Sequence, residues 1–234
     1  MKILAIDTAT EACSAALKID GEILSHYQVA PREHSRLILK MIDDLLSQAN
    51  MSISDVDAIA FGRGPGSFMG LRIAAGVVQG IAFAHDIPVI PVSSLKAIAQ
   101  RVYSETQNEN VLVAIDARMD EVYWAAYYLE NRQWLLYGEE SVMSPDDVLL
   151  PVIPEKPDIR WAAAGTGWAS YQDRLLPQTT KQLTAVLPEF LPSAEAIALL
   201  AVDDLLAGRV VSAAQAIPVY LRNDVAKKPK LVVF

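Results

Sequence analysis

Two aspartates that follow short apolar runs are the residues of this sequence best placed to do chemistry. Asp7 follows residues 3–6, and Asp116 follows residues 113–115. Acids at the ends of two strands that face one cleft could orient the metal ion of a bound nucleotide. Thr8 and Arg118, which stand beside them, are then further candidates for nucleotide-facing residues. From the residues alone, the simpler interpretation is favoured: an acid after a strand begins a turn.

A glycine-rich stretch, residues 62–72, follows another apolar run and reads Gly-Arg-Gly-Pro-Gly-Ser-Phe-Met-Gly-Leu-Arg. It is not a phosphate-binding P-loop, because no Lys-Ser/Thr pair follows it. It is also a poor dinucleotide fingerprint, because Pro65 intrudes and no acid ends the next strand. The pattern instead predicts a turn that starts a helix. Pro65 and Gly66 suit the centre of a type II turn, with positive φ at Gly66, and Ser67 suits the N-cap.

Metal-dependent and hydrolytic sites have little support in this sequence. The three histidines, His26, His34 and His85, are not spaced as ligand pairs, so we expect no metal site and no catalytic residue. His34 and Ser35 are adjacent, but no Gly-x-Ser-x-Gly elbow accompanies them. The single cysteine, Cys13, is expected to pack in a strand as a small apolar residue.

The charge balance argues against autonomous nucleic-acid binding. The chain of 234 residues has a formal net charge of -8, which repels phosphate backbones. A local exception is the basic C-terminus, with Arg222, Lys227, Lys228 and Lys230. One cysteine and no signal peptide predict a reducing, cytoplasmic location.

The segments around the glycine-rich stretch predict alternating strands and helices. Strands are expected at 2–6, 13–19 and 22–27, and helices at 35–48 and 68–85. Residues 71–83 are apolar on every side, which requires burial all round, and are too few to span a bilayer. Gly76 and Gly80 share one face. The helix therefore lies either inside a large core or between its own sheet and a partner protein, and periodicity does not decide between them.

An internal repeat organises the whole chain. Three strands, a helix, a strand and a helix occur in order, and the same order returns after the polar residues 105–110. Ser144 and Pro145 are expected to start the second repeat's first helix. The predicted class is α/β, with one lobe at residues 1–104 and a second at 105–234. The tail after about residue 210 is expected to return to the first lobe.

Several motifs, in this order, resemble those of the bacterial TsaB (YeaZ) family. They cover essentially the whole chain: residues 6–10 (Ile-Asp-Thr-Ala-Thr), His34-Ser35, residues 64–72, residues 115–123 (Ile-Asp-Ala-Arg-Met-Asp-Glu-Val-Tyr) and residues 218–222 (Pro-Val-Tyr-Leu-Arg). One departure is Met69, where the family usually has Thr. The resemblance implies an actin- and Hsp70-like (ASKHA) fold of two lobes, each a mixed sheet with flanking helices.

The resemblance also implies a function. TsaB proteins support the formation of N6-threonylcarbamoyladenosine in tRNAs that read ANN codons. The transferase is the paralogue TsaD, whose metal-binding histidine pair is missing here, and the ATPase TsaE joins the assembly. We therefore expect a non-catalytic subunit that binds TsaD, forms a homodimer in its absence, and meets tRNA only through the complex. It would have no cofactor of its own, with ATP or ADP near the interface with TsaD, and no membrane partner.

Family contacts with TsaD, or with a second TsaB, use the two helices of the first lobe. The resemblance therefore predicts a partner surface formed by His34, Leu37, Ile38, Met41, Leu45, Phe68, Leu71, Arg72, Ala74, Ala75 and Val78. Val78→Glu or Met41→Glu should abolish association with little loss of fold. The alternative function is an independent ATPase or kinase of the same fold that uses Asp7 and Asp116.

Overall fold

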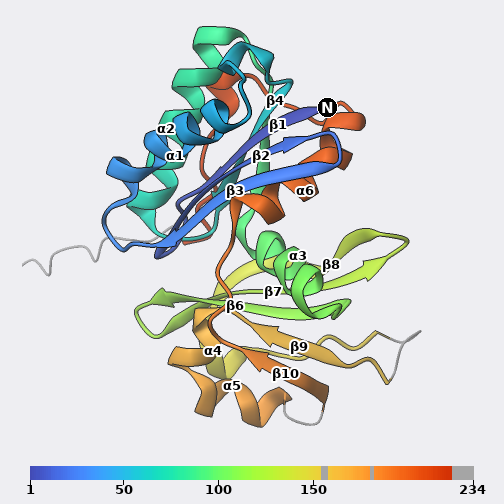
Figure 1. Cartoon of the computed structure of the whole chain (residues 1–234). Coiled ribbons are helices and arrows are strands. Elements are labelled where there is room, and N and C mark those ends of the chain that lie inside the picture. The colour runs from blue at the N-terminus through green and yellow to red at the C-terminus, as the bar shows by residue number, and fades with distance from the viewer. Residues whose placement is uncertain (154–157, 180–181, 223–234) are drawn as a thin grey trace, which may run out of the picture.

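Two five-stranded sheets, one above the other in Figure 1, form the two lobes of the molecule. The computed structural model describes residues 1–153, 158–179 and 182–222. Lys227, Lys228 and Lys230 of the basic C-terminus lie outside these residues.

Both sheets have the same strand order. The first has the order β3-β2-β1-β4-β5 and is built from β1 (Lys2–Asp7), β2 (Ala12–Ile19), β3 (Glu22–Val29), β4 (Ala58–Gly64) and β5 (Val89–Ser93). The second has the order β10-β9-β6-β7-β8 and is built from β6 (Asn110–Arg118), β7 (Glu121–Glu130), β8 (Gln133–Met143), β9 (Trp161–Ala164) and β10 (Leu183–Leu187). In each sheet the first three strands are antiparallel and the last two join in parallel. The predicted two-lobed ASKHA fold is therefore confirmed, and the predicted repeat is confirmed for the strands of the two sheets.

Helices cover both faces of the first sheet. One face is covered by α1 (His34–Gln48) and α2 (Phe68–His85), which lie side by side in Figure 1. Leu4 and Ile6 of β1 face these helices, whereas Ile3 and Ala5 face the other side. Burial on both faces explains why β1 is an unbroken apolar run rather than an alternating one.

The last helix of each repeat packs on the sheet of the other repeat. Leu95, Ile98 and Val102 of α3 (Ser94–Thr106) belong to the core of the second sheet. Ala194 and Ile197 of α6 (Ala194–Leu206) belong to the core of the first. A division of the chain at residue 104 therefore does not separate two independent cores, because α3 and α6 each cross to the other lobe.

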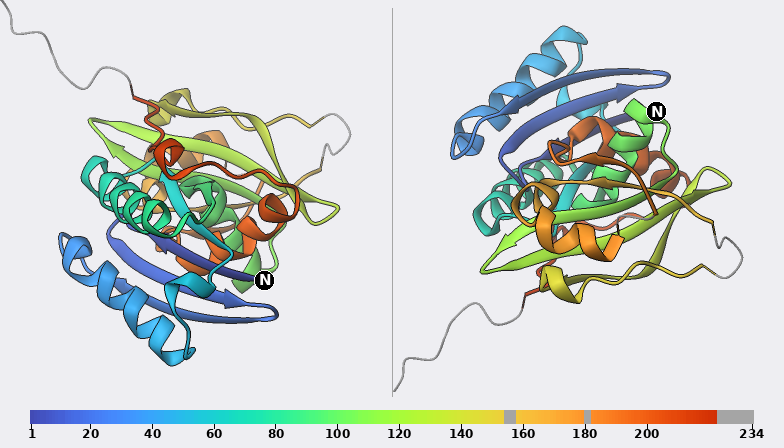
Figure 2. Two further views of the ribbon diagram at one scale, coloured as in Figure 1. Left: turned by 90° about the horizontal axis from the view of Figure 1, so that it is seen from above. Right: turned by 90° about the horizontal axis from the view of Figure 1, so that it is seen from below.

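The chain returns to the first lobe earlier than residue 210. It does so at α6, and η4 (Ala213–Gln215) then packs on α2. Val89 and Val211 form an isolated bridge beside it. Figure 2 shows this last segment, in red, running back across the first lobe near α2.

Two local predictions were wrong. Ser144 caps only a three-residue 3₁₀ turn, η2 (Pro145–Asp147), so the second repeat has no counterpart of α1. In the glycine-rich stretch, Gly64 rather than Gly66 has a positive φ, 106°, and the Gly64–Pro65 peptide is cis. The predicted cap is confirmed, because the Ser67 side chain accepts a hydrogen bond from the Gly70 N–H at 3.4 Å.

The bounds of α2 are those predicted, residues 68–85. With 18 residues, it is the one helix among the described residues that is long and apolar enough to cross a bilayer by length and composition. The apolar residues 71–83, too few to span a bilayer by themselves, lie within this longer helix. Its inward side, including Leu71, Ala74 and Val78, is buried against the first sheet, as in the core helix of a globular protein.

The remaining described elements complete the second lobe and the connections. They are the 3₁₀ turn η1 (Ile53–Asp55) and the short helices α4 (Thr166–Ser170) and α5 (Gln172–Thr179).

Candidate functional site

A cleft of about 810 Å³ lies between the lobes. Its wall on the first lobe comes from the β1–β2 turn, the start of α1 and the N-terminus of α2. Its wall on the second comes from the β6–β7 turn and α4. Of the four predicted nucleotide-facing residues, Asp116 and Arg118 line this cleft.

Asp116 is already surrounded by donors. Its carboxylate accepts hydrogen bonds from the Arg118 N–H at 2.8 Å, from the Ser170 hydroxyl at 3.3 Å and from the Tyr171 hydroxyl at 3.3 Å. It also pairs with the Arg118 guanidinium at 3.0 Å. The same guanidinium reaches Glu11 of the first lobe at 3.4 Å. Asp116 is thus already held by hydrogen bonds and an ion pair within the chain.

Asp7 and Thr8 do not reach the cleft. Both are fully buried, and the Thr8 hydroxyl donates to the Gly70 carbonyl at 2.7 Å. Asp7 Oδ1 accepts the Ala9 N–H at 3.1 Å, while Oδ2 has no hydrogen-bond partner. Burial raises the pKa of Asp7 to about 7, against the smaller opposing effect of the Ala9 hydrogen bond. Asp7 and Thr8 therefore do not face the cleft: the N-terminus of α2 covers Thr8, and Gly62 and Ile197 of α6 enclose the Asp7 carboxyl.

The glycines of the stretch 62–72 explain this covering. A Cβ at Gly70 would lie 1.9 Å from the Thr8 carbonyl oxygen, and one at Gly66 would lie 2.3 Å from that of Ala9. Real Cβ atoms do not approach so closely, so glycine is required for α2 to begin against the β1–β2 turn. These glycines allow α2 to begin here and to pack closely, and the start of a helix is what the sequence predicts for this stretch.

The predicted partner surface contains many residues of the chain's own core. Phe68 is 50% exposed and Arg72 is also exposed, whereas Leu37 is only partly exposed. The others have at most 8% of their area exposed: His34, Ile38, Met41, Leu45, Leu71, Ala74, Ala75 and Val78. The two helices form where the sequence predicts them, but these residues lie on their inward sides. A partner cannot contact them without unfolding the lobe.

The outward side of α2 carries a different set of residues. Exposed positions recur every three or four residues and so form one stripe, which we call the α2 stripe: Met69, Arg72, Gly76, Gly80 and Phe83. Phe83 is 86% exposed and Met69 is 63% exposed. A Cβ at Gly76 or Gly80 would meet nothing within 4 Å. The two glycines therefore serve no packing contact within the described part of the chain.

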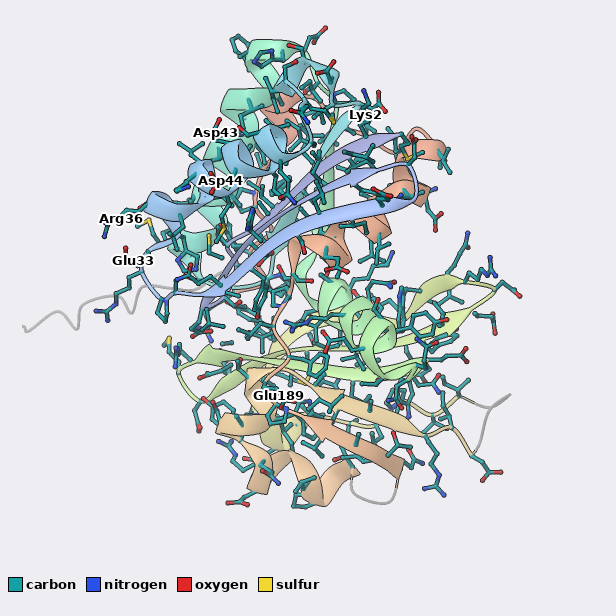
Figure 3. All side chains as sticks on the ribbon, viewed as in Figure 1. Lys2, Glu33, Arg36, Asp43, Asp44 and Glu189 are labelled. Atoms are coloured by element: carbon teal, nitrogen blue, oxygen red, sulfur yellow. The ribbon has the colours of Figure 1, made fainter. Side chains whose placement is uncertain are left out.

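The outward side of α1 is charged instead. Figure 3 shows Glu33, Arg36, Asp43 and Asp44 along it. Arg36 pairs with Glu33 at 2.8 Å, and Lys40 pairs with Asp44 at 2.6 Å. The α2 stripe is therefore the more apolar of the two helix surfaces. The spacing of Arg72, Gly76 and Gly80 in the sequence was the signal that could have identified this side of α2.

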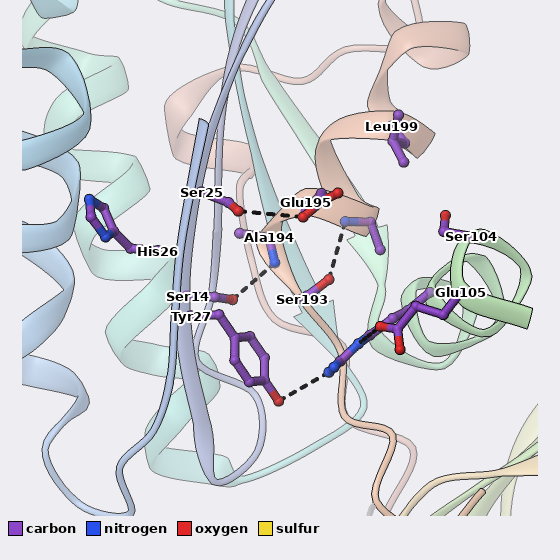
Figure 4. A pocket seen from close by; sticks show the side chains of 12 residues that line it. Ser14, Ser25, His26, Tyr27, Ser104, Glu105, Ser193, Ala194, Glu195 and Leu199 are labelled. Atoms are coloured by element: carbon purple, nitrogen blue, oxygen red, sulfur yellow. Dashed lines mark hydrogen bonds and ion pairs between the residues drawn. The ribbon is translucent and has the colours of Figure 1, made fainter. Parts of the chain in front are cut away.

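A smaller cavity of about 220 Å³ lies between β2, β3, α3 and the start of α6 (Figure 4). Its polar groups are paired with one another. Ser25 donates to Glu195 at 3.4 Å, and Arg101 donates to Glu105 at 2.7 Å and to the Tyr27 hydroxyl at 3.1 Å. Nothing in it points to a ligand.

Metal-ligand chemistry has no evident place either. Within residues 1–153, 158–179 and 182–222, no three His, Cys, Asp or Glu side chains gather as a metal site would require. Cys13 is buried, and burial together with the charge of Asp7 raises its pKa to about 11. It is therefore a thiol, and a poor nucleophile, at neutral pH.

Comparisons with known proteins agree with one another. A family model described as "TsaD: tRNA N6-adenosine threonylcarbamoyltransferase" matches residues 24–230. The "tRNA threonylcarbamoyladenosine biosynthesis protein TsaB" of Escherichia coli K12 is 43% identical over 232 residues, 97% of each chain. The Haemophilus influenzae protein of the same name is 42% identical over 236 residues, which cover 97% of this chain and 96% of the relative. Among solved structures, "YeaZ from Pseudomonas aeruginosa" has a TM-score of 0.87 and 49% identity, over 94% of this chain and 99% of that chain.

Proposed function

The chain belongs to the TsaB (YeaZ) family, within the wider family whose model describes TsaD, and from this membership we propose that it acts in tRNA threonylcarbamoyladenosine biosynthesis. Its role there is that of a non-catalytic subunit, which binds and supports the TsaD transferase, with TsaE joining the assembly. The substrates are tRNAs that read ANN codons, and they are bound through the complex rather than by this chain. The chain works in the cytoplasm.

The α2 stripe is the observation that carries the partner role. Two glycines without contacts stand at the centre of the stripe, between the apolar side chains of Met69 and Phe83. Glycine in an exposed helix interior costs about 1 kcal/mol relative to alanine, and small residues let another helix approach closely. The occupant that we propose is TsaD, with a second copy of this chain in its absence.

The state of the two aspartates favours an accessory role over an independent enzyme. The Asp7 carboxyl is buried between Gly62 and Ile197 of α6, and the charge of Asp116 is balanced by Arg118. An ATPase or kinase of this fold would need carboxylates that can reach a metal–nucleotide. Measuring ATP hydrolysis by the isolated chain and by Asp7→Asn tests the alternative. Robust hydrolysis that depends on Asp7 would refute the non-catalytic role.

A nucleotide enters the proposal only at the shared interface. We place ATP or ADP near the contact with TsaD, at the cleft side where Arg118 and the hydroxyls of Thr10 and Ser67 stand. The chain alone is expected to bind nucleotide weakly, because Arg118 already pairs with Asp116 and Glu11. Titration of labelled ATP into the chain, with and without TsaD, checks this. Equal affinity in both arms would contradict it.

The α2 stripe is tested by reconstituting tRNA modification from TsaD, TsaE, tRNA, a threonylcarbamoyl donor and this chain. Gly80→Arg places a large charged side chain in the stripe, where the chain's own atoms leave room for it. We expect co-purification with TsaD and tRNA modification to be lost, while the melting temperature is kept. The matched control is Leu149→Arg, at a second-lobe position that is 77% exposed. Normal association by Gly80→Arg would show that the stripe is not the interface.

A further inference from the structure

The last described residues of the chain cross from one lobe to the other. We propose that residues 217–222, which we call the clip, hold the two lobes together and limit how far the cleft can open. The clip contains the sequence Pro218-Val219-Tyr220-Leu221-Arg222. Tyr220 and Arg222 both line the cleft.

The first anchor of the clip is on β4. The Val219 N–H donates to the Arg63 carbonyl at 2.7 Å. A Cβ at Gly64 would lie 2.8 Å from the Val219 carbonyl oxygen, so the clip lies directly against the backbone of the glycine-rich stretch. The Arg63 side chain also reaches the second lobe, pairing with Glu140 of β8 at 3.5 Å.

The second anchor is at the N-terminus of α2. The rings of Tyr220 and Phe68 have centroids 5.4 Å apart, within the range of favourable aromatic pairs. The Tyr220 hydroxyl accepts a hydrogen bond from Arg72 Nε at 3.3 Å. The Arg72 guanidinium in turn lies 3.9 Å from the centre of the Phe68 ring.

The third anchor is on the second lobe. The Arg222 guanidinium donates to the Ala117 carbonyl at 3.0 Å and to the Arg118 carbonyl at 3.2 Å, and it pairs with Glu121. Its side chain is only 16% exposed. The bonded carbonyls are those of the last two residues of β6, next to the β6–β7 turn, and three successive residues here, 118–120, have φ of 61°, 57° and 66°. Non-glycine residues seldom adopt this left-handed conformation, so Arg222 supports a turn that is costly by itself.

The chain between the anchors is short. Val219 and Arg222 are three residues apart, and extended chain spans at most about 3.3–3.6 Å per residue. An opening that carries the β6–β7 turn away from β4 beyond the reach of this segment must therefore break one of the anchors. The other contact at the cleft mouth, Arg118 with Glu11, has side chains 74% and 44% exposed. Exposed pairs of this kind contribute little, so the clip is the main restraint on this side.

The test is a distance measurement between the lobes of the isolated, full-length chain. Spin labels go on Asp43→Cys in α1 and Asp173→Cys in α5, both exposed positions. The buried Cys13 stays unlabelled. Electron–electron double resonance then compares the clip variants Arg222→Ala and Tyr220→Ala with Ile217→Ala. Ile217 is in the same segment, is 61% exposed, and makes no anchor contact described above.

We expect Arg222→Ala and Tyr220→Ala to lengthen and broaden the distance distribution, with Ile217→Ala unchanged. Glu121→Gln, which weakens the third anchor from the side of the second lobe, should act in the same direction. A distribution that Arg222→Ala and Glu121→Gln both leave unchanged, with melting curves showing folded protein, would overturn the proposal. No partner protein is needed, so this outcome is independent of whether the chain binds TsaD.

Discussion

Asp7 and Gly62 lie so close together that a Cβ at Gly62 would be 1.9 Å from Asp7 Oδ2. Ile197 Cδ1, from α6, is 3.4 Å from the same point. The carboxyl therefore occupies a space that exists only because position 62 has no side chain and α6 closes it. Apolar surroundings disfavour the charged form, which is why the pKa of Asp7 rises to about 7.

The first prediction concerns the pH dependence of stability. Asp7 ionises near pH 4 in the unfolded chain and near pH 7 in the folded one. Between these values the folded state binds more protons, so the free energy of unfolding falls as pH rises and levels off above pH 7. From pH 5 to pH 8 the loss due to Asp7 should be about 2–3 kcal/mol.

Asp7→Asn should remove this contribution. Urea unfolding at pH 5 and pH 8 measures the difference for both proteins, so any constant cost of the buried amide cancels. The control is Asp43→Asn, at an exposed position on α1. If Asp7→Asn and the parent chain lose the same free energy between the two pH values, Asp7 is not the buried titrating group.

The second prediction compares two glycines of α2. Gly70→Ala places a Cβ 1.9 Å from the Thr8 carbonyl oxygen, a backbone atom that cannot move aside cheaply. It should lower the free energy of unfolding by about 1–3 kcal/mol or more. Gly76→Ala meets nothing within 4 Å, and it should raise stability by about 1 kcal/mol through helix propensity alone. Urea unfolding at matched protein concentration measures the free energy of unfolding of both variants. Equal effects would contradict the close packing of the start of α2 against the β1–β2 turn.

The third prediction corrects the variants that the sequence suggests for the partner surface. Val78 has no exposed area, so Val78→Glu buries a charge and should cost at least about 4 kcal/mol. Loss of association by that variant would report unfolding rather than a broken interface. Phe83→Glu, at a position that is 86% exposed, should change stability by no more than about 0.5 kcal/mol. Thermal melts distinguish the two, and a folded Val78→Glu would refute the placement of α2.

The repeat in element order was predictable because it depends on local patterns that recur. The apolar runs that end in Asp7 and Asp116 became β1 and β6, each at the centre of its sheet. Ser67, Ser93 and Ser193 each cap the helix that follows them. Local chemistry also set the helix of residues 68–85, since capping and apolar length are properties of the segment itself.

What could not be predicted depends on which element covers which side. Because α2 is apolar on all sides, periodicity could not show whether Val78 or Gly80 lies on the exposed side of the helix. The prediction therefore placed Val78, which is buried, on the partner surface. The crossing of α3 and α6 to the opposite sheets follows from the packing of both lobes. The burial of Asp7 is likewise a tertiary property, since it requires Gly62 of β4 and Ile197 of α6 to come together around the carboxyl.

The last prediction concerns a buried contact between the lobes. Glu140 of β8 accepts hydrogen bonds from the Ser93 hydroxyl and, at 2.6 Å, from the Tyr127 hydroxyl, and it pairs with Arg63 of β4. Its side chain is 9% exposed. Burial and the charge of Glu140 raise the pKa of Tyr127, so this hydroxyl stays protonated, and a donor, at neutral pH. Glu140→Ala leaves two buried hydroxyls without their acceptor, which should lower the free energy of unfolding by about 2–4 kcal/mol. Glu140→Gln, which keeps one acceptor oxygen, should lose less of this free energy.

The matched control is Glu139→Ala, one residue away and exposed, with an expected change in the free energy of unfolding of no more than about 0.5 kcal/mol. Urea unfolding ranks the three variants, and a Glu140→Ala as stable as Glu139→Ala would mean that the lobes are held together without this carboxylate.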